Sequence, residues 1–236
     1  MLTQAVILAG GQGTRIKELT KDEISKVMLP VNHKPFLYYI LMYLKGEGIR
    51  NIILCVGHKK ETIKEYFGDG SKLGIEINYI EENVPLGTAG AIKNAEKFIM
   101  DESFFLLNGD TFSPISLGEL FGFHNSKSAV VTIALKEIED CYRYGRVELD
   151  KDFCIRSFTE KGIHQPGLIN SGIYVVQRSV LNSIKRNTFV SLEKDILAFL
   201  VGRGLYGRVF DSYFIDIGVP EDYFKANDEI PKYFNI

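Results

Sequence analysis

The sequence predicts a single α/β domain with a Rossmann-like fold, in which helices flank a mostly parallel central sheet. Short apolar runs that suit buried strands alternate along the first half with segments of helical spacing. The first of these runs ends in a glycine-rich turn. The length of 236 residues, with 45% hydrophobic and 25% charged residues, is ordinary for one compact domain with a sizeable core.

The composition bears on which partners the protein could bind and on the cellular compartment in which it works. The formal net charge of −2 does not support a nucleic-acid partner, which usually requires a basic surface. Cys55, Cys141 and Cys154 lack CxxC or Cys/His metal spacing, which favours a reduced, cytoplasmic setting. Neither a signal peptide nor a long apolar stretch is present, so we expect no membrane partner. The oligomeric state stays open, a homo-oligomer included.

The first half is expected to follow a β-α-β-α order. Apolar runs and alternating patterns mark its strands, and apolar residues at helical spacing mark its helices. Thr88 is the expected N-cap of one of these helices. We expect strands at 5–8, 51–56, 75–80, 104–107 and 129–135, and helices at 36–48, 60–67, 89–98 and 117–125.

The pattern changes in the second half, where short strands have few helices between them. This predicts a small mixed or antiparallel extension over the sheet, able to close over a second substrate. Ser191 is a plausible N-cap, and Pro220 opens a last helix. We expect strands at 145–149, 155–159, 170–176, 205–210 and 213–215, and helical segments at 181–185 and 192–201.

The turn after the first strand has the chemistry of a polyphosphate cradle. Gly10, Gly11 and Gly13 remove three Cβ atoms within four residues, which allows unusual φ values and exposes N–H groups to phosphate oxygens. Arg15 adds a planar cationic fork, and Lys26 is a second cation that could fold back over the loop.

Two known phosphate-binding motifs do not fit this turn. A Walker A loop needs Lys and then Ser or Thr after its last glycine, whereas Thr14 and Arg15 follow Gly13. The dinucleotide fingerprint GxGxxG, begun at Gly11, would need a glycine where Ile16 stands. A glycine-rich turn that binds nothing is the remaining structural alternative.

The turn closely resembles the signature of the sugar-1-phosphate nucleotidylyltransferases. The matching motifs are LAGGxGTR at 8–15 and SKxxLP at 25–30, which contains Lys26. The resemblance extends over nearly the whole chain and implies that Arg15, Lys26 and Lys161 are catalytic. It implies a nucleotide site formed by Leu8, Ala9, Gly10, Gly11, Gly13, Thr14, Arg15, Lys26, Glu81, Pro85, Gly87, Thr88 and Gly109.

The segment PLGTAGA at 85–91 resembles the purine-using, particularly guanylyl-transferring, members of this family. The Glu81 carboxylate could accept from guanine N1 and N2, an edge that adenine lacks, so GTP is favoured. As a bare sequence, PLGTAG is equally a helix entry whose small residues allow tight packing.

Two aspartates are candidate Mg²⁺ ligands. Asp110 follows a buried strand, and the carboxyl ends of strands in open α/β sheets face the ligand crevice. Asp216 begins a motif that resembles the family's closing motif with its second metal-binding aspartate.

The second substrate is assigned through the resemblance. Lys161 would hold the sugar phosphate, Glu160 and Asn170 sugar hydroxyls, and Gly145 would belong to the same site. Gly162 stands where the family often has proline. We therefore expect residues 1–135 to bind mainly the nucleotide and 136–236 mainly the sugar phosphate, without the C-terminal β-helix of longer relatives.

The implied activity is transfer of a nucleoside monophosphate to a sugar 1-phosphate, with release of pyrophosphate. Within the family, the short chain most resembles bacterial guanylyltransferases of D-glycero-α-D-manno-heptose 1-phosphate, which feed surface-polysaccharide assembly. Mannose 1-phosphate is the alternative sugar, and another nucleotide-sugar pyrophosphorylase a broader one. A non-catalytic nucleotide sensor and a glycosyltransferase are the alternative classes. A glycosyltransferase usually carries a DxD-type acidic pair, and the nearest DxD here, at 150–152, lies in a charged turn.

Overall fold

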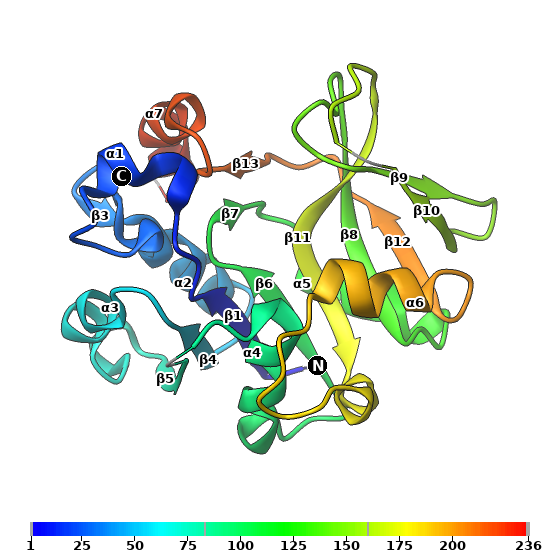
Figure 1. Ribbon diagram of the computed structural model, residues 1–236, viewed down its shortest axis with the longest axis horizontal. Helices are drawn as coiled ribbons and strands as arrows, with labels where there is room; N and C mark the ends of the chain where they lie inside the picture. Colours follow the sequence, from blue (N-terminus) through cyan, green and yellow to red (C-terminus); the bar gives the residue numbers. More distant parts are fainter. Residues whose placement is uncertain (1, 83, 160, 235–236) are drawn as a thin grey trace.

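The structure, a computed structural model, describes residues 2–82, 84–159 and 161–234. A nine-stranded sheet runs through this part of the chain, with helices on both faces (Figure 1). The strands are β1 (Gln4–Ala9), β2 (Pro30–Val31), β3 (Lys34–Pro35), β4 (Asn51–Val56), β5 (Glu76–Glu81), β6 (Ser103–Asn108), β7 (Thr111–Phe112), β8 (Val131–Ile138), β9 (Arg146–Leu149), β10 (Ile155–Phe158), β11 (Gly167–Gln177), β12 (Leu205–Val209) and β13 (Ile215–Asp216). The α-helices are α1 (Lys17–Thr20), α2 (Phe36–Gly46), α3 (Lys60–Phe67), α4 (Gly87–Ala95), α5 (Leu117–Ser126), α6 (Ala198–Leu200) and α7 (Pro220–Glu229).

Strand β1 is the centre of the parallel part of the sheet. It pairs in parallel with β4 on one side and β6 on the other, and β5 extends the sheet beyond β4. Ala5 and Ile7 belong to a core shared with α2, whereas Val6 belongs to a second core shared with α4. Because both faces of β1 are covered, its sequence is a continuous apolar run.

Strand β11 joins the two halves of the molecule. Its residues 173–177 pair antiparallel with β6, and its residues 168–169 pair antiparallel with β9. Strand β8 also pairs antiparallel with β11. The predicted antiparallel extension is therefore a continuation of the central sheet rather than a layer over it (Figure 1). The predicted α/β class with a mostly parallel central part is confirmed.

Besides shifted element ends, such as the strand predicted at 213–215 that the structure has at Ile215–Asp216, two helix predictions differ. Thr88 lies inside α4, whose N-cap position is Leu86, so Thr88 is not the cap. The helix predicted at 181–185 is a 3₁₀ segment at Arg178–Ser183, while Ser191 caps its segment as expected by accepting from the Lys194 amide. No helix among the described residues is long and apolar enough to cross a membrane.

A short ladder between β7 and β13 brings distant parts of the chain together. Asp216 pairs with Thr111 in this ladder, and the Ile217 amide donates to the Asp110 carbonyl at 3.0 Å. The segment that carries Asp216 is thereby placed beside the end of β6.

Candidate active site

A cavity of about 610 Å³ opens beyond the carboxyl ends of β1, β4 and β6. This is the edge at which open α/β sheets bind ligands, and the size is typical of small-molecule sites. The cavity wall includes many of the residues predicted to bind nucleotide or metal. These are Leu8, Ala9, Gly10, Gly11, Lys26, Pro85, Gly87, Thr88 and Asp110.

The glycines of the cradle differ in what requires them. A Cβ on Gly10 would lie 3.3 Å from the Gly57 amide nitrogen, so the two loops depend on close backbone approach. Gly13 has φ of +61°, and its Cβ would lie 3.2 Å from Lys26 Cβ. A Cβ on Gly11 would meet no atom within 4 Å. Packing therefore explains Gly10 and Gly13, whereas Gly11 leaves open space at the cavity wall.

The loop after β6 packs directly on the end of β1. The Gly109 amide donates to the Leu8 carbonyl at 2.9 Å, and a Cβ on Gly109 would lie 2.7 Å from that oxygen. Gly109 is thus required by packing, and it does not line the cavity, although it was predicted in the nucleotide site. Its position places Asp110 beside Lys26.

Lys26, Asp110 and Asp216 form one charged cluster. Lys26 Nζ donates to Asp110 Oδ2 at 2.8 Å and lies 3.8 Å from Asp216 Oδ1, with its side chain only 9% exposed. The Gly218 amide donates to Asp216 Oδ1 at 2.7 Å. Burial, and then the charge of Asp110, raise the pKa of Asp216. Asp110 is therefore close enough for its charge to disfavour the ionised form of Asp216.

This cluster fits a magnesium ion. Hard divalent cations prefer oxygen ligands, and Mg²⁺ usually keeps several waters or phosphate oxygens beside one or two carboxylates. Asp110 and Asp216 provide two carboxylates of that kind, 2.8 Å and 3.8 Å from the same Lys26 ammonium. Among the described residues no cluster of three or more His, Cys, Asp or Glu side chains is placed to hold a metal.

Arg15 lies on the Asp216 side of the cluster and not in the cavity wall. Its Nη2 atom is 3.0 Å from the position that a Cβ on Gly218 would occupy, and its charge favours the ionised form of Asp216. Arg15 and Thr14 are exposed in a 3₁₀ turn at Thr14–Ile16. A triphosphate would therefore meet Arg15 from solvent.

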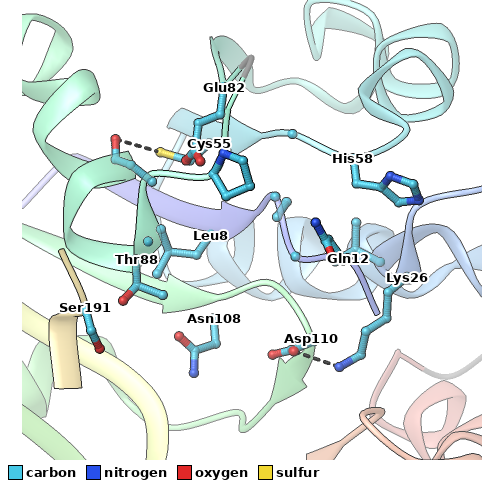
Figure 2. Close-up of a pocket in the computed structure, with 18 of the residues that line it drawn as sticks. Leu8, Gln12, Lys26, Cys55, His58, Glu82, Thr88, Asn108, Asp110 and Ser191 are labelled. Atoms are coloured by element: carbon cyan, nitrogen blue, oxygen red, sulfur yellow. Dashed lines mark hydrogen bonds and ion pairs between the residues drawn. The ribbon is translucent and has the colours of Figure 1, made fainter. Parts of the chain in front are cut away.

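Glu82, rather than the predicted Glu81, lies in the cavity wall. Glu81 is held by ion pairs with Lys60 and Lys64, each at 2.7 Å, and is absent from the lining. Glu82 is half-buried, its Oε2 accepts from the Leu86 amide at 3.2 Å, and burial raises its pKa. Figure 2 shows Glu82 at the opposite end of the pocket from the Lys26–Asp110 pair.

The glycines of PLGTAG allow α4 to pack against a segment of the second half. A Cβ on Gly87, whose φ is +71°, would lie 2.5 Å from the Val190 carbonyl oxygen, and one on Gly90 would lie 2.8 Å from the Thr188 carbonyl oxygen. Thr88 Oγ1 accepts from the Leu192 amide at 2.7 Å. The small residues therefore serve tight packing, as the structural alternative predicted, although Gly87 and Thr88 also line the cavity.

Of the residues predicted for the sugar phosphate, Gly145, Lys161 and Asn170 lie outside this cavity. The Asn170 side chain donates to Tyr174 Oη at 2.8 Å and accepts from the Gly172 amide at 2.9 Å. A Cβ on Gly145 would lie 2.7 Å from the Thr159 carbonyl oxygen, so this glycine serves close packing. Lys161 is exposed after β10, and Glu160 falls outside the described residues.

Some residues of the cavity wall were not predicted from the sequence. Gly57 and His58 follow the buried strand β4, and Asn108 ends β6, so the strand-end rule applied to every strand would have found them. Residues from the second half had no local signal. The missed residues are Gln12, Val27, Cys55, Gly57, His58, Glu82, Val84, Ala91, Asn108, Phe189, Ser191 and Glu193.

Comparison with known proteins gives the class of this molecule. The nucleotidyl transferase family profile matches residues 4–233. The chain belongs to the nucleotidyl transferase family.

Particular relatives resemble the chain over nearly its full length. It is 46% identical to a D-glycero-α-D-manno-heptose 1-phosphate guanylyltransferase of Campylobacter jejuni, covering 94% of this chain and 97% of that relative. A protein of the same name from Aneurinibacillus thermoaerophilus is 41% identical, with 98% and 99% covered. The crystal structure of HddC from Yersinia pseudotuberculosis complexed with GMP-PN superposes with a TM-score of 0.85, at 36% identity and with 97% and 99% covered.

Proposed function

We propose that this chain transfers GMP from GTP to a sugar 1-phosphate, with D-glycero-α-D-manno-heptose 1-phosphate as the sugar substrate, and releases pyrophosphate. The observation that carries the proposal is the arrangement of one cavity. A carboxylate, Glu82, lies at one end, and Lys26 with Asp110 lies at the other (Figure 2). Asp216, outside the cavity lining, is 3.8 Å from Lys26. The names of the similar proteins from Campylobacter and Aneurinibacillus support the same substrates.

The Glu82 end suits guanine. An ionised carboxylate accepts hydrogen bonds and cannot donate them, and guanine offers N1–H and N2–H side by side. Adenine has a hydrogen-bond acceptor at N1, so two acceptors would face each other and no hydrogen bond would form. We therefore infer that Glu82 takes the base-reading role that the sequence suggested for Glu81.

The opposite end suits the reacting phosphates. A sugar 1-phosphate oxygen attacks the α-phosphorus of GTP in line, the bond from that phosphorus to the bridging oxygen breaks, and pyrophosphate leaves with that oxygen. Amides of the 10–13 loop, with Arg15 and Lys26, would bind the phosphate oxygens of the leaving group. Because phosphate monoesters are largely ionised at neutral pH, with a second pKa of about 6, no general base is needed.

A bound Mg²⁺, held by Asp110 and Asp216, would supply charge neutralisation at the α-phosphate. These side chains are already held in place without it, by Lys26 and by the Gly218 amide. Lys161 is our candidate for holding the attacking sugar phosphate. It would have to approach the cluster from the exposed segment after β10.

A pyrophosphate-release assay with a panel of triphosphates and sugar phosphates tests the proposal. We expect release only when a triphosphate, a sugar 1-phosphate and Mg²⁺ are all present. A nucleotide sensor would bind GTP without release. A glycosyltransferase would consume a nucleotide sugar and release no pyrophosphate.

A further inference from the structure

An exposed aromatic side chain stands in the wall of the nucleotide cavity. Phe189 is 67% exposed and lines the cavity, although it comes from the second half of the chain. Exposing so large an apolar side chain has no benefit for folding, because its burial is what would stabilise the protein. Exposure alone does not distinguish Phe189, because Phe199 is 64% exposed, but Phe189 also lines the cavity, which directs attention to a ligand.

The backbone around Phe189 is held firmly against α4. The Val190 amide donates to the Leu86 carbonyl at 2.8 Å, and the Ala89 amide donates to the Val190 carbonyl at 3.0 Å. The glycines at 87 and 90 make this approach sterically feasible. The aromatic ring is thus presented on a fixed segment.

The same hydrogen bonds place Phe189 at the Glu82 end of the cavity. Leu86 donates its amide to the Glu82 carboxylate and accepts, through its carbonyl, from the residue that follows Phe189. A base read at its edge by Glu82 would have its face available to a neighbouring side chain. Phe189 is an aromatic side chain placed at that end.

We propose that Phe189 is a positioning residue that packs on the face of the bound nucleobase. Stacking on an aromatic ring does not depend on which base is present, because every base has a π-face. Glu82 would then select guanine, while Phe189 would hold the base without selecting it. This inference rests on the proposed nucleotide site, although not on the identity of the sugar.

The natural absence of tryptophan provides a direct binding test. Phe189→Trp would introduce the only indole, whose emission should be quenched on titration with GTP but not with inorganic tripolyphosphate. Phe199→Trp is the matched control, because Phe199 is 64% exposed and does not line the cavity. The proposal is overturned if both variants respond alike to GTP, or if Phe189→Trp binds GTP without a change in emission.

Kinetics separate stacking from base selection. We expect Phe189→Ala to raise the KM for the triphosphate about tenfold with kcat within about twofold, the size expected for losing one base–aromatic contact. Phe189→Tyr should restore KM, and Phe199→Ala should behave as the natural protein. The kcat/KM ratio of GTP to ATP should stay constant in Phe189→Ala and fall in Glu82→Gln.

The outcomes distinguish the two proposals. If the enzyme prefers a nucleotide other than GTP, the guanine assignment fails, yet Phe189→Ala should still raise the KM for that nucleotide. If GTP is used with an unchanged KM in Phe189→Ala, the role of Phe189 is refuted and the guanylyl transfer stands.

Discussion

Lys26 donates a 2.8 Å hydrogen bond to Asp110 across 84 positions of sequence. The same ammonium group lies 3.8 Å from Asp216. One lysine therefore neutralises part of the charge of two carboxylates. An incoming triphosphate and cation would replace this internal pairing. Lys26 would then contact phosphate oxygens, and Asp110 and Asp216 would contact the cation.

Replacing either aspartate by asparagine should impair catalysis without unfolding the protein. We expect Asp110→Asn and Asp216→Asn each to lower turnover by about two orders of magnitude or more, through loss of charge that organises the metal. Asp152→Asn, in the exposed turn at 150–152, is the control and should keep full activity. Near-normal Mg²⁺-dependent turnover in both site variants would refute the metal assignment.

Gly11 should be required for the ligand and not for the fold. Because a Cβ at this position meets no protein atom within 4 Å, Gly11→Ala should leave the thermal midpoint within a few degrees of the natural value. The added methyl group would enter space beside the phosphates, so the KM for GTP should rise about tenfold or more, as for loss of a charge-assisted contact. A variant with normal KM would show that the cradle has been misplaced.

Glu82 and Glu81 should differ sharply under the same substitution. Glu82→Gln should lower the kcat/KM ratio of GTP to ATP by about tenfold or more, because it removes an acceptor facing guanine N–H groups. Glu81→Gln removes only outward ion pairs and should leave the ratio unchanged. If Glu81→Gln alters the ratio and Glu82→Gln does not, the original assignment from sequence was correct.

The pH dependence of GTP binding follows from the same carboxylate. Burial raises the pKa of Glu82, so its protonation begins at a higher pH than for an ordinary glutamate. The ionised form accepts from guanine, and therefore the KM for GTP should increase as the pH falls through this raised pKa and stay flat above it. Because Asp216 also has a raised pKa, Glu82→Gln should remove the part of this rise that is specific to GTP over ATP and leave the part common to both.

Gly87 should be essential for packing. A Cβ there would combine a φ of +71° with an approach of 2.5 Å to the Val190 carbonyl, so Gly87→Ala should destabilise the protein by about 2 kcal/mol or more. Gly122, exposed in α5 with no atom within 4 Å of its Cβ, is the matched control. Gly122→Ala should stabilise by about 0.5–1 kcal/mol. Equal unfolding free energies for the two variants would contradict this packing role.

Local patterns predicted much of the fold. The elements β4 and α3 coincide with the predicted ranges 51–56 and 60–67, because apolar runs, charge patterns and a closing glycine are all local signals. The connection of β11 to β6, β8 and β9 was not predicted. Pairing between strands far apart in sequence depends on the whole chain.

The site, like the fold, was predicted where the signal is local and missed where it depends on contacts between distant parts of the chain. The cradle and Asp110 follow strand ends and could be found from the sequence, whereas Phe189 and Glu193 reach the cavity through packing on α4. Glu82 was missed by one position. Glu81 is the last residue of β5 and Glu82 follows it, and successive side chains of an extended chain point to opposite sides. A shift of one residue therefore exchanges the ion-paired surface glutamate for the one in the cavity.

The most direct test of the proposed function compares two kcat/KM values of the purified protein, measured with GTP at the same Mg²⁺ concentration. One is for D-glycero-α-D-manno-heptose 1-phosphate and the other is for mannose 1-phosphate. We expect a clear preference for the heptose substrate and, with that substrate, for GTP over ATP, UTP, dTTP and CTP. A preference for mannose 1-phosphate would contradict the heptose assignment. A preference for a pyrimidine triphosphate would contradict the role of Glu82 as the reader of guanine.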